Sequence, residues 1–218
     1  MVIRNTFVGL AKATHFGPTV LVVTISFVLA ISQLSLPKSV GIAVAIFAGQ
    51  CVVGWTNDLI DYPRDMQAKR TKKPLVRQSV SHTQLHIGIS VALTAALLLS
   101  FLGPLGIKGG LLHMLGLASA TIYNFGAKAT WLSPIPYAIS FGAMPWAIYS
   151  VVGKHPPIWL FLDFALISVA FHFLNVIKDL EWDRRQMVLG LPQRISARWS
   201  SLVAITLILL SIVLFLTR

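Results

Sequence analysis

The sequence predicts an all-α membrane protein, a multi-span bundle of transmembrane helices. Of its 218 residues 56% are hydrophobic and only 11% are charged, and the mean hydropathy is +0.76. A soluble domain carries roughly 25% charged residues, so this composition excludes a soluble globular protein, and the same hydrophobicity excludes a disordered one. The second observation is a series of apolar segments, each about as long as the 20 residues that a helix needs to cross a bilayer.

Seven such segments follow one another, and most contain no charged residue. They run over 18–36, 39–57, 83–103, 107–127, 134–152, 157–177 and 199–217. Proline and glycine mark the breaks between them, as turn residues do. No shift in composition indicates a second domain, so we expect one transmembrane bundle over residues 1–218.

The basic residues are distributed unevenly about these segments. If the seven segments alternate in direction, all but four of the 18 Lys and Arg lie on one side of the membrane. The four exceptions are Lys38, Lys108, Lys154 and Arg218. The positive-inside rule places the basic side in the cytoplasm. We therefore expect a multi-pass protein of the cell membrane, with its N-terminus and basic loops cytoplasmic.

The net charge of +11 and the single cysteine, Cys51, limit the possible partners. A lone cysteine excludes an internal disulfide framework and a cysteine-rich metal site. A basic excess is typical of nucleic-acid binding as well as of membrane surfaces, but so apolar a chain favours the membrane surface. We expect membrane lipid, and no nucleic acid, as a partner.

Six of the seven acidic residues form two clusters, both on the predicted cytoplasmic side. The clusters consist of Asp58, Asp61 and Asp65 after the second segment and Asp179, Glu181 and Asp183 after the sixth. On an ideal helix the three aspartates of the first cluster lie at i, i+3 and i+7, on one narrow face. Asp179 and Asp183 lie at i and i+4, also on one face.

Carboxylates presented by two helices are suited to a hard divalent cation. Mg²⁺ keeps several waters and is usually bound by one or two carboxylates together with substrate phosphates. Basic residues stand nearby to neutralise the remaining phosphate charge, namely Arg70, Lys72, Lys73 and Lys178. We find no glycine-rich phosphate loop, so a lipid-tailed diphosphate is favoured over a nucleotide.

Two other interpretations of the acids stay open. Carboxylates beside Lys and Arg at helix ends are also typical of surface ion pairs, which contribute under about 1 kcal/mol. Acids in an apolar bundle also occur in cation transporters, although transport sites lie near the bilayer midplane and these acids lie at segment ends. Two clusters on one side favour a shared metal–diphosphate site over both.

Residues 57–65, NDLIDYPRD, have the pattern NDxxDxxxD, and residues 70–75, RTKKPL, are close to RTxxRPL. Residues 179–183, DLEWD, have the weaker pattern DxxxD, and LPQR follows at 191–194. Together these motifs resemble the UbiA superfamily of intramembrane prenyltransferases, in which the first motif follows helix two and the second follows helix six. The resemblance covers most of the chain.

The resemblance implies Mg²⁺-dependent transfer of an isoprenyl group from a prenyl diphosphate to a small lipophilic or aromatic acceptor, with release of pyrophosphate. Metal and cations would stabilise the charge on the leaving group, and a dry bundle would shield the allylic carbocation from water. Terpene cyclisation and phosphoribosyl transfer to a polyprenyl phosphate are alternatives on the same scaffold. A non-catalytic or transporting membrane protein is the alternative outside enzymes.

The resemblance also assigns roles to individual residues. The expected metal ligands are Asp58, Asp61, Asp65, Asp179 and Asp183. All of them except Asp58 are also the expected catalytic residues. The expected substrate-binding residues are Asn57, Arg70, Lys73, Tyr123, Lys128, Asn175 and Lys178. Asn175 and His172 share the helical face of Asp179, where they would orient an acceptor or simply join helices through polar contacts. An interfacial Tyr and a snorkelling Lys are the alternative for Tyr123 and Lys128.

Three departures from the family pattern affect these expectations. Pro63 falls inside the first motif, where it is expected to break the helix and place Asp65 on a new turn. Lys73 replaces the usual Arg, which removes bidentate phosphate binding. The superfamily usually has nine helices, and the last two are not found among our seven. Lipid or a partner subunit, as in a homo-oligomer, would then cover the exposed seam.

Overall fold

The computed structural model describes residues 2–218, with side chains from Thr6 onward, and in this part of the chain all regular structure is helical. The residues separate into two compact units, Met1–Leu111 and Leu112–Arg218. The prediction of an all-α transmembrane bundle is confirmed. The prediction of a single domain over residues 1–218 stays a prediction.

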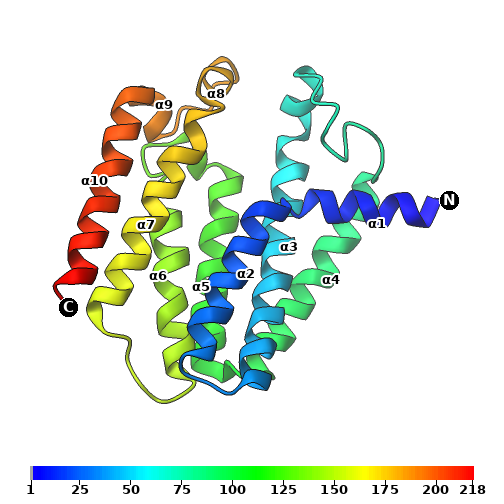
Figure 1. Ribbon diagram of the computed structural model, residues 1–218. Helices are drawn as coiled ribbons and strands as arrows, with labels where there is room; N and C mark the ends of the chain where they lie inside the picture. The colour runs from blue at the N-terminus through cyan, green and yellow to red at the C-terminus, as the bar shows by residue number, and fades with distance from the viewer. Residues whose placement is uncertain (1) are drawn as a thin grey trace. The chain divides into compact units, whose positions relative to one another are not determined.

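Unit 1 is built around one long helix. Its helices are α1 (Val2–Ala13), α2 (Phe16–Ile31), α3 (Leu36–Gln67), α4 (His82–Phe101) and the first residues of α5 (Gly106–Phe125). Both α2 and α4 pack along α3 (Figure 1). At one end of α3, buried Leu75 and Val80 from the loop 68–81 join Leu85 of α4 and Ala13 of α1 in a common core.

The sharp corner between α1 and α2 brings the N-terminal segment onto α3. The two helices are bent by 64° at their break, and His15 there has a left-handed backbone with φ of 56°. The indole N–H of Trp55 donates to the carbonyl oxygen of Leu10 over 2.9 Å. A Cβ on Gly54 would lie 2.8 Å from the carbonyl oxygen of Ala13, so only glycine allows this approach. The sequence had not predicted α1 as a helix.

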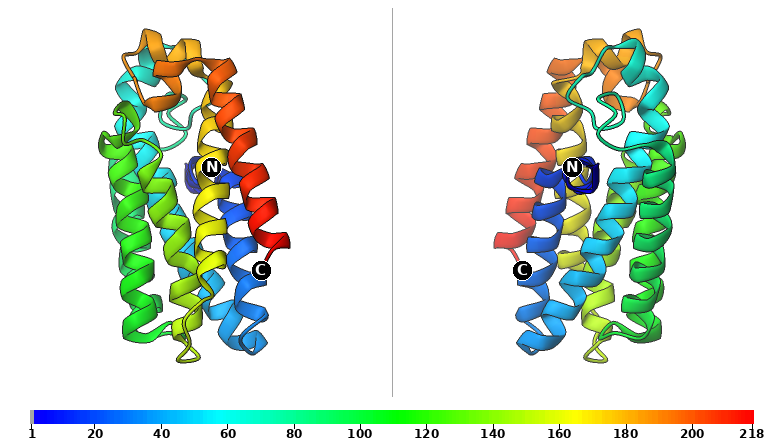
Figure 2. Two further views of the ribbon diagram at one scale, coloured as in Figure 1. Left: turned by 90° about the vertical axis from the view of Figure 1, so that its left-hand side faces the viewer. Right: turned by 90° about the vertical axis from the view of Figure 1, so that its right-hand side faces the viewer.

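Unit 2 contains the remaining helices. They are the rest of α5, the 3₁₀ helix η1 (Ala127–Ala129), α6 (Ile135–Ser150), α7 (Ile158–Ile177), α8 (Leu180–Arg185), α9 (Leu191–Ile195) and α10 (Ala197–Leu216). The helix α7 packs against both α6 and α10 (Figure 2). Buried Ala170 and Phe173 of α7 meet Ala204 of α10 in the core of this unit.

The seven predicted spans correspond to the seven long helices α2–α7 and α10. Four of these (α3, α4, α7 and α10) are individually long and apolar enough to cross a membrane, and the bent pair α1–α2 raises the number to five. The other two fall short because α6 has only 16 residues and α5 is less apolar. The apolar helices nevertheless identify an integral membrane protein.

The expectation that Pro63 breaks the helix is wrong, because α3 continues through it to Gln67. Pro63 cannot donate to the carbonyl of Leu59, a loss that contributes to the roughly 3 kcal/mol cost of proline in a helix interior. The flanking side chains of Leu59 and Tyr62 pack against the core of unit 1, and this tertiary packing outweighs the local preference. Asp65 therefore lies on the same helix as the other aspartates of the first motif.

Candidate functional site

Asp58 is the most enclosed carboxylate of the first motif, with 2% of its surface exposed. Its Oδ1 lies 2.5 Å from Nζ of Lys73 and 2.9 Å from Nε2 of His15. Its Oδ2 is buried and has no hydrogen-bond partner among the described residues. A buried carboxylate requires such pairing to offset its lost hydration, so Asp58 serves as the anchor for two groups that are distant from it in sequence.

Asp61 is engaged by residues of its own helix. The side-chain amide of Asn57 donates to Oδ2 over 3.1 Å, and Arg64 pairs with Oδ1. These partners lie one helical turn before and after Asp61. Helical spacing therefore gathers an amide, a carboxylate and a guanidinium on one face of α3.

Asp65 lies between two cations of the loop 68–81. Its Oδ1 is 3.7 Å from Nε of Arg70, and its Oδ2 is 3.9 Å from Nζ of Lys73. Only 4% of Asp65 is exposed. The loop that carries both cations folds back through backbone hydrogen bonds, including one of 3.0 Å from Arg70 N to Asp65 O. Asp65, Arg70 and Lys73, predicted from the sequence as site residues, are thus brought together.

The second motif begins where α7 ends. Asp179 is the N-cap residue of α8, and the backbone N–H of Asp183 donates to its carbonyl oxygen over 2.8 Å. This is the helical i to i−4 bond, so the two aspartates keep the predicted helical spacing. Oδ2 of Asp183 accepts a 2.9 Å hydrogen bond from the side-chain amide of Gln193, a buried residue of α9.

A buried serine anchors the segment that follows the second motif. Oγ of Ser133 accepts from the backbone N–H of Leu191 over 3.1 Å and lies 3.1 Å from Nε2 of His172. A Cβ on Gly190 would lie 2.4 Å from the carbonyl oxygen of Lys128. This close approach ties the segment of α9 to the turn around η1, which carries the predicted substrate-binding Lys128.

His172 is 1% exposed and lies in an aromatic cluster. Its ring centroid is 4.7 Å from that of Tyr137 and 5.6 Å from that of Tyr123. These contacts favour a structural role for His172 between helices, one of the two roles open from the sequence. The nearby Asn175 is exposed on α7, and its predicted role in substrate binding stays a prediction, as does that of Tyr123.

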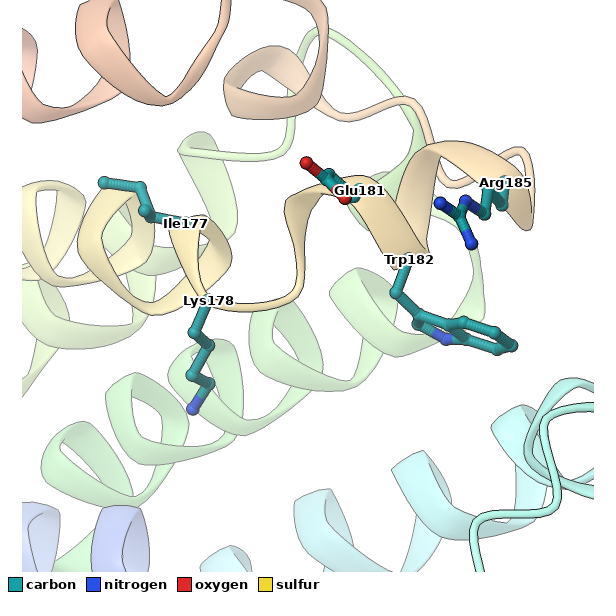
Figure 3. A pocket seen from close by; sticks show the side chains of 5 residues that line it. All are labelled: Ile177, Lys178, Glu181, Trp182 and Arg185. Atoms are coloured by element: carbon teal, nitrogen blue, oxygen red, sulfur yellow. The ribbon is translucent and has the colours of Figure 1, made fainter.

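A pocket of about 430 Å³ opens beside the second motif (Figure 3). Its lining consists of Ile177, Lys178, Glu181, Trp182 and Arg185. The side chains of Lys178 and Trp182 extend to the same side of the chain (Figure 3). Two cations and an indole ring line it together with the carboxylate of Glu181, and the predicted role of Lys178 in substrate binding stays a prediction.

The donor chemistry of the two motifs fits Mg²⁺. Among the described residues no three His, Cys, Asp or Glu side chains are grouped to hold a metal ion. Mg²⁺ needs no such cage, because waters and substrate phosphates complete its shell around one or two carboxylates. Asp61 and Asp65 offer such hard oxygens on one helix. Arg64, Arg70 and Lys73 pair with these two carboxylates, which shows that negative charge is concentrated there.

Several residues of these clusters were not predicted from the sequence as site residues, among them His15, Ser133 and Gln193. His15 lies outside both motifs, and nothing near it in sequence indicates its contact with Asp58. Ser133 precedes a proline as many turn residues do. Gln193 lies in the LPQR segment, whose spacing from the second motif was the one available signal.

Comparison with known proteins identifies the fold and the family of the chain. A search of curated protein sequences gives no match. The fold matches a UbiA homologue from Archaeoglobus fulgidus bound to GPP and Mg²⁺, with 15% identity, a TM-score of 0.79, and coverage of 96% of this chain and 77% of that one. The same homologue bound to DMAPP and Mg²⁺ gives a TM-score of 0.78 at the same identity and coverage.

A third structure, described for digeranylgeranylglyceryl phosphate synthase, is 17% identical with a TM-score of 0.69. It is matched over 98% of this chain and 76% of its own length. At these identities the likeness concerns the fold. A sequence model of the UbiA prenyltransferase family matches residues 18–218, nearly the whole chain. The chain therefore belongs to the UbiA prenyltransferase family.

Proposed function

We propose that the protein transfers an isoprenyl group from a prenyl diphosphate to a lipophilic or aromatic acceptor inside the membrane, with Mg²⁺ as cofactor and pyrophosphate as the second product. The observation that carries this proposal is the first motif of a UbiA-family chain. There Asp61 and Asp65 lie on one helix, and Arg70 and Lys73 flank Asp65. Such a group of acids and cations is suited to a metal-bound diphosphate.

In the proposed mechanism the two motifs act on one diphosphate. Asp61 and Asp65, with Asp179 and Asp183, would hold Mg²⁺, which when bound would supply charge neutralisation for the leaving pyrophosphate. Asn57, which donates to Asp61, would help to bind the substrate. Arg70, Lys73 and Lys178 bind the phosphate oxygens through charge-assisted hydrogen bonds.

The donor class is supported by the archaeal homologue, whose structures contain GPP or DMAPP together with Mg²⁺. The apolar helices would exclude water from the carbocation, so that the acceptor rather than water captures it. The excess of Lys and Arg near both motifs supports a site at the cytoplasmic face of the cell membrane.

The direct test is pyrophosphate release by the purified protein in lipid nanodiscs. DMAPP, GPP and longer prenyl diphosphates would be supplied with Mg²⁺, and a chelator would abolish release. Asp61→Asn and Asp179→Asn are expected to lower release by about 100-fold or more. Asp163→Asn is the matched control, since Asp163 is the acidic residue outside both motifs. Full turnover in both motif variants would contradict the proposed roles.

Two further measurements separate the alternatives. Incubation with donor alone distinguishes cyclisation, which needs no acceptor, from transfer, which requires one. Mass spectrometry of lipids from cells with and without the gene would reveal a missing prenylated product. The structure of that product would identify both the chain length of the donor and the acceptor.

A further inference from the structure

We propose that Asp58 is a positioning residue rather than a metal ligand, and that together with His15 it holds Lys73 beside Asp65 where the diphosphate binds. The proposal rests on the proposed function and reassigns one aspartate of the first motif. It also adds His15, from outside the motif, to the residues that shape the site.

Asp58 is more buried than Asp61, and it is paired more closely than the similarly buried Asp65, whose two cations lie at 3.7 and 3.9 Å. A carboxylate that binds a metal must be either open to it or only loosely paired with the cations of the protein. The side chain of Asp61 is 20% exposed, whereas that of Asp58 is 2% exposed. Both contacts of Asp58 use the same oxygen, Oδ1, which faces Lys73 and His15. Its other oxygen is enclosed in the protein.

Lys73 forms the link from Asp58 to the predicted metal ligand. Its Nζ is 2.5 Å from Oδ1 of Asp58 and 3.9 Å from Oδ2 of Asp65, and its side chain keeps 22% exposure. An ammonium group carries three N–H donors, so the bond to Asp58 leaves donors for a phosphate oxygen. The buried contact with Asp58 therefore sets the position of Lys73, and the exposed part of the Lys73 side chain remains open to a phosphate.

His15 supports this arrangement from the corner between α1 and α2. Its Nε2 is 2.9 Å from Asp58 Oδ1 and 3.5 Å from Lys73 Nζ. The left-handed corner between α1 and α2 fixes its backbone, and Gly54 allows that corner to rest on α3. The cluster thus connects three segments: the α1–α2 corner, α3, and the loop 68–81 that carries the phosphate-binding cations.

The test compares Asp58→Asn with Asp61→Asn, which has the same change of charge on the same helix. Mn²⁺ binding, measured by electron paramagnetic resonance in nanodiscs without turnover, is expected to weaken by about tenfold or more in Asp61→Asn and to weaken much less in Asp58→Asn. Hydrogen exchange of the amides in loop 68–81 is expected to rise in Asp58→Asn and to stay unchanged in Asp61→Asn. Equal weakening of Mn²⁺ binding in both variants, with an unchanged loop, would overturn the proposal.

Milder variants at two positions, His15 and Lys73, keep the test decisive if Asp58→Asn does not fold. His15→Gln leaves the carboxylate and Lys73 in place and is expected to raise loop exchange to a smaller extent. Lys73→Ala is expected to raise the KM for the prenyl diphosphate by about tenfold with a smaller change in kcat, and Lys73→Arg to restore most of it. No response to His15→Gln, or no rescue by arginine, contradicts positioning through this cluster. Because Mn²⁺ binding and hydrogen exchange need no turnover, failure of the transferase proposal would be seen separately.

Discussion

The two acidic motifs of this chain are held in place by different forces. In the first, α3 runs unbroken through the motif, and cations of the following loop pair with its buried aspartates. In the second, the helix breaks at Asp179, and a neutral amide from Gln193 holds Asp183. A serine hydroxyl and a close-packed glycine then fix the chain that follows. Ion pairs with loop cations help to fix the first motif, and a neutral hydrogen bond together with close backbone packing helps to fix the second.

The largest expected effects come from removing one charge in each motif. Asp65→Asn and Asp183→Asn are both expected to lower pyrophosphate release by about 100-fold or more, if the proposed roles hold. Their effects on structure should differ. Asparagine at 65 no longer balances Arg70 and Lys73, so the loop 68–81 should exchange hydrogen faster. Asparagine at 183 still accepts the bond from Gln193, so the second motif should keep its protection.

Hydrogen-exchange mass spectrometry of both variants measures this difference in one experiment. Equal loosening of the two motifs would contradict the distinction between charge-held and packing-held carboxylates. Pyrophosphate release is measured in the same samples. Of the two variants, only Asp183→Asn is expected to lose turnover without faster hydrogen exchange.

The second expected effect is the dependence of the second motif on Gly190. An alanine Cβ there would lie 2.4 Å from the Lys128 carbonyl oxygen and 3.0 Å from Ser133 Oγ. Overpacking of this kind destabilises a protein by typically 1–3 kcal/mol, so we expect Gly190→Ala to lower the thermal midpoint in detergent by several degrees. Gly17→Ala is the control, because a Cβ on Gly17 would meet no atom within 4 Å. An unchanged midpoint for Gly190→Ala would show that the segment is not packed as described.

The sequence was sufficient for the features that depend on local pattern. The apolar segments predicted the long helices because burial in lipid requires about 20 apolar residues. The clustering of acids predicted both motifs, and the spacing of Arg70 and Lys73 placed them near Asp65. The N-terminal helix α1 was missed because its apolar residues are too few to resemble a span.

Long-range contacts could not be predicted in this way. His15 is 43 residues from Asp58 in sequence, and Ser133 is 58 residues from Leu191. Neither pair has a periodic signal, because the contact arises from how the helices pack. Pro63 shows the converse case, in which a strong local signal for a break was outweighed by packing around the flanking residues.

A smaller effect is expected from the hydroxyl group that anchors the second motif. Ser133→Ala removes the acceptor for the backbone N–H of Leu191 and leaves that buried donor unsatisfied. Such a loss costs about 1–3 kcal/mol, and we expect a lower thermal midpoint with faster exchange at the Leu191 amide. Ser90→Ala is the matched control, since Ser90 is exposed and bonds only within its own helix. Equal midpoints for the two variants would contradict the anchoring role of Ser133.

The smallest expected effect concerns Arg64, the cation paired with Asp61. This pair is partly exposed, and such i, i+3 pairs contribute only about 0.3–1 kcal/mol, so Arg64→Ala should change the thermal midpoint very little. With Asp61 as a proposed metal ligand, Arg64 would compete with the metal ion for the same carboxylate. Removing an interaction of that size should lower the Mg²⁺ concentration for half-maximal activity by about two- to fivefold. Arg77→Ala, which removes an exposed cation from the loop 68–81, controls for the change in net charge. If both variants shift the Mg²⁺ requirement equally, the effect is one of general charge, and the pairing of Arg64 with Asp61 does not regulate metal binding at the first motif.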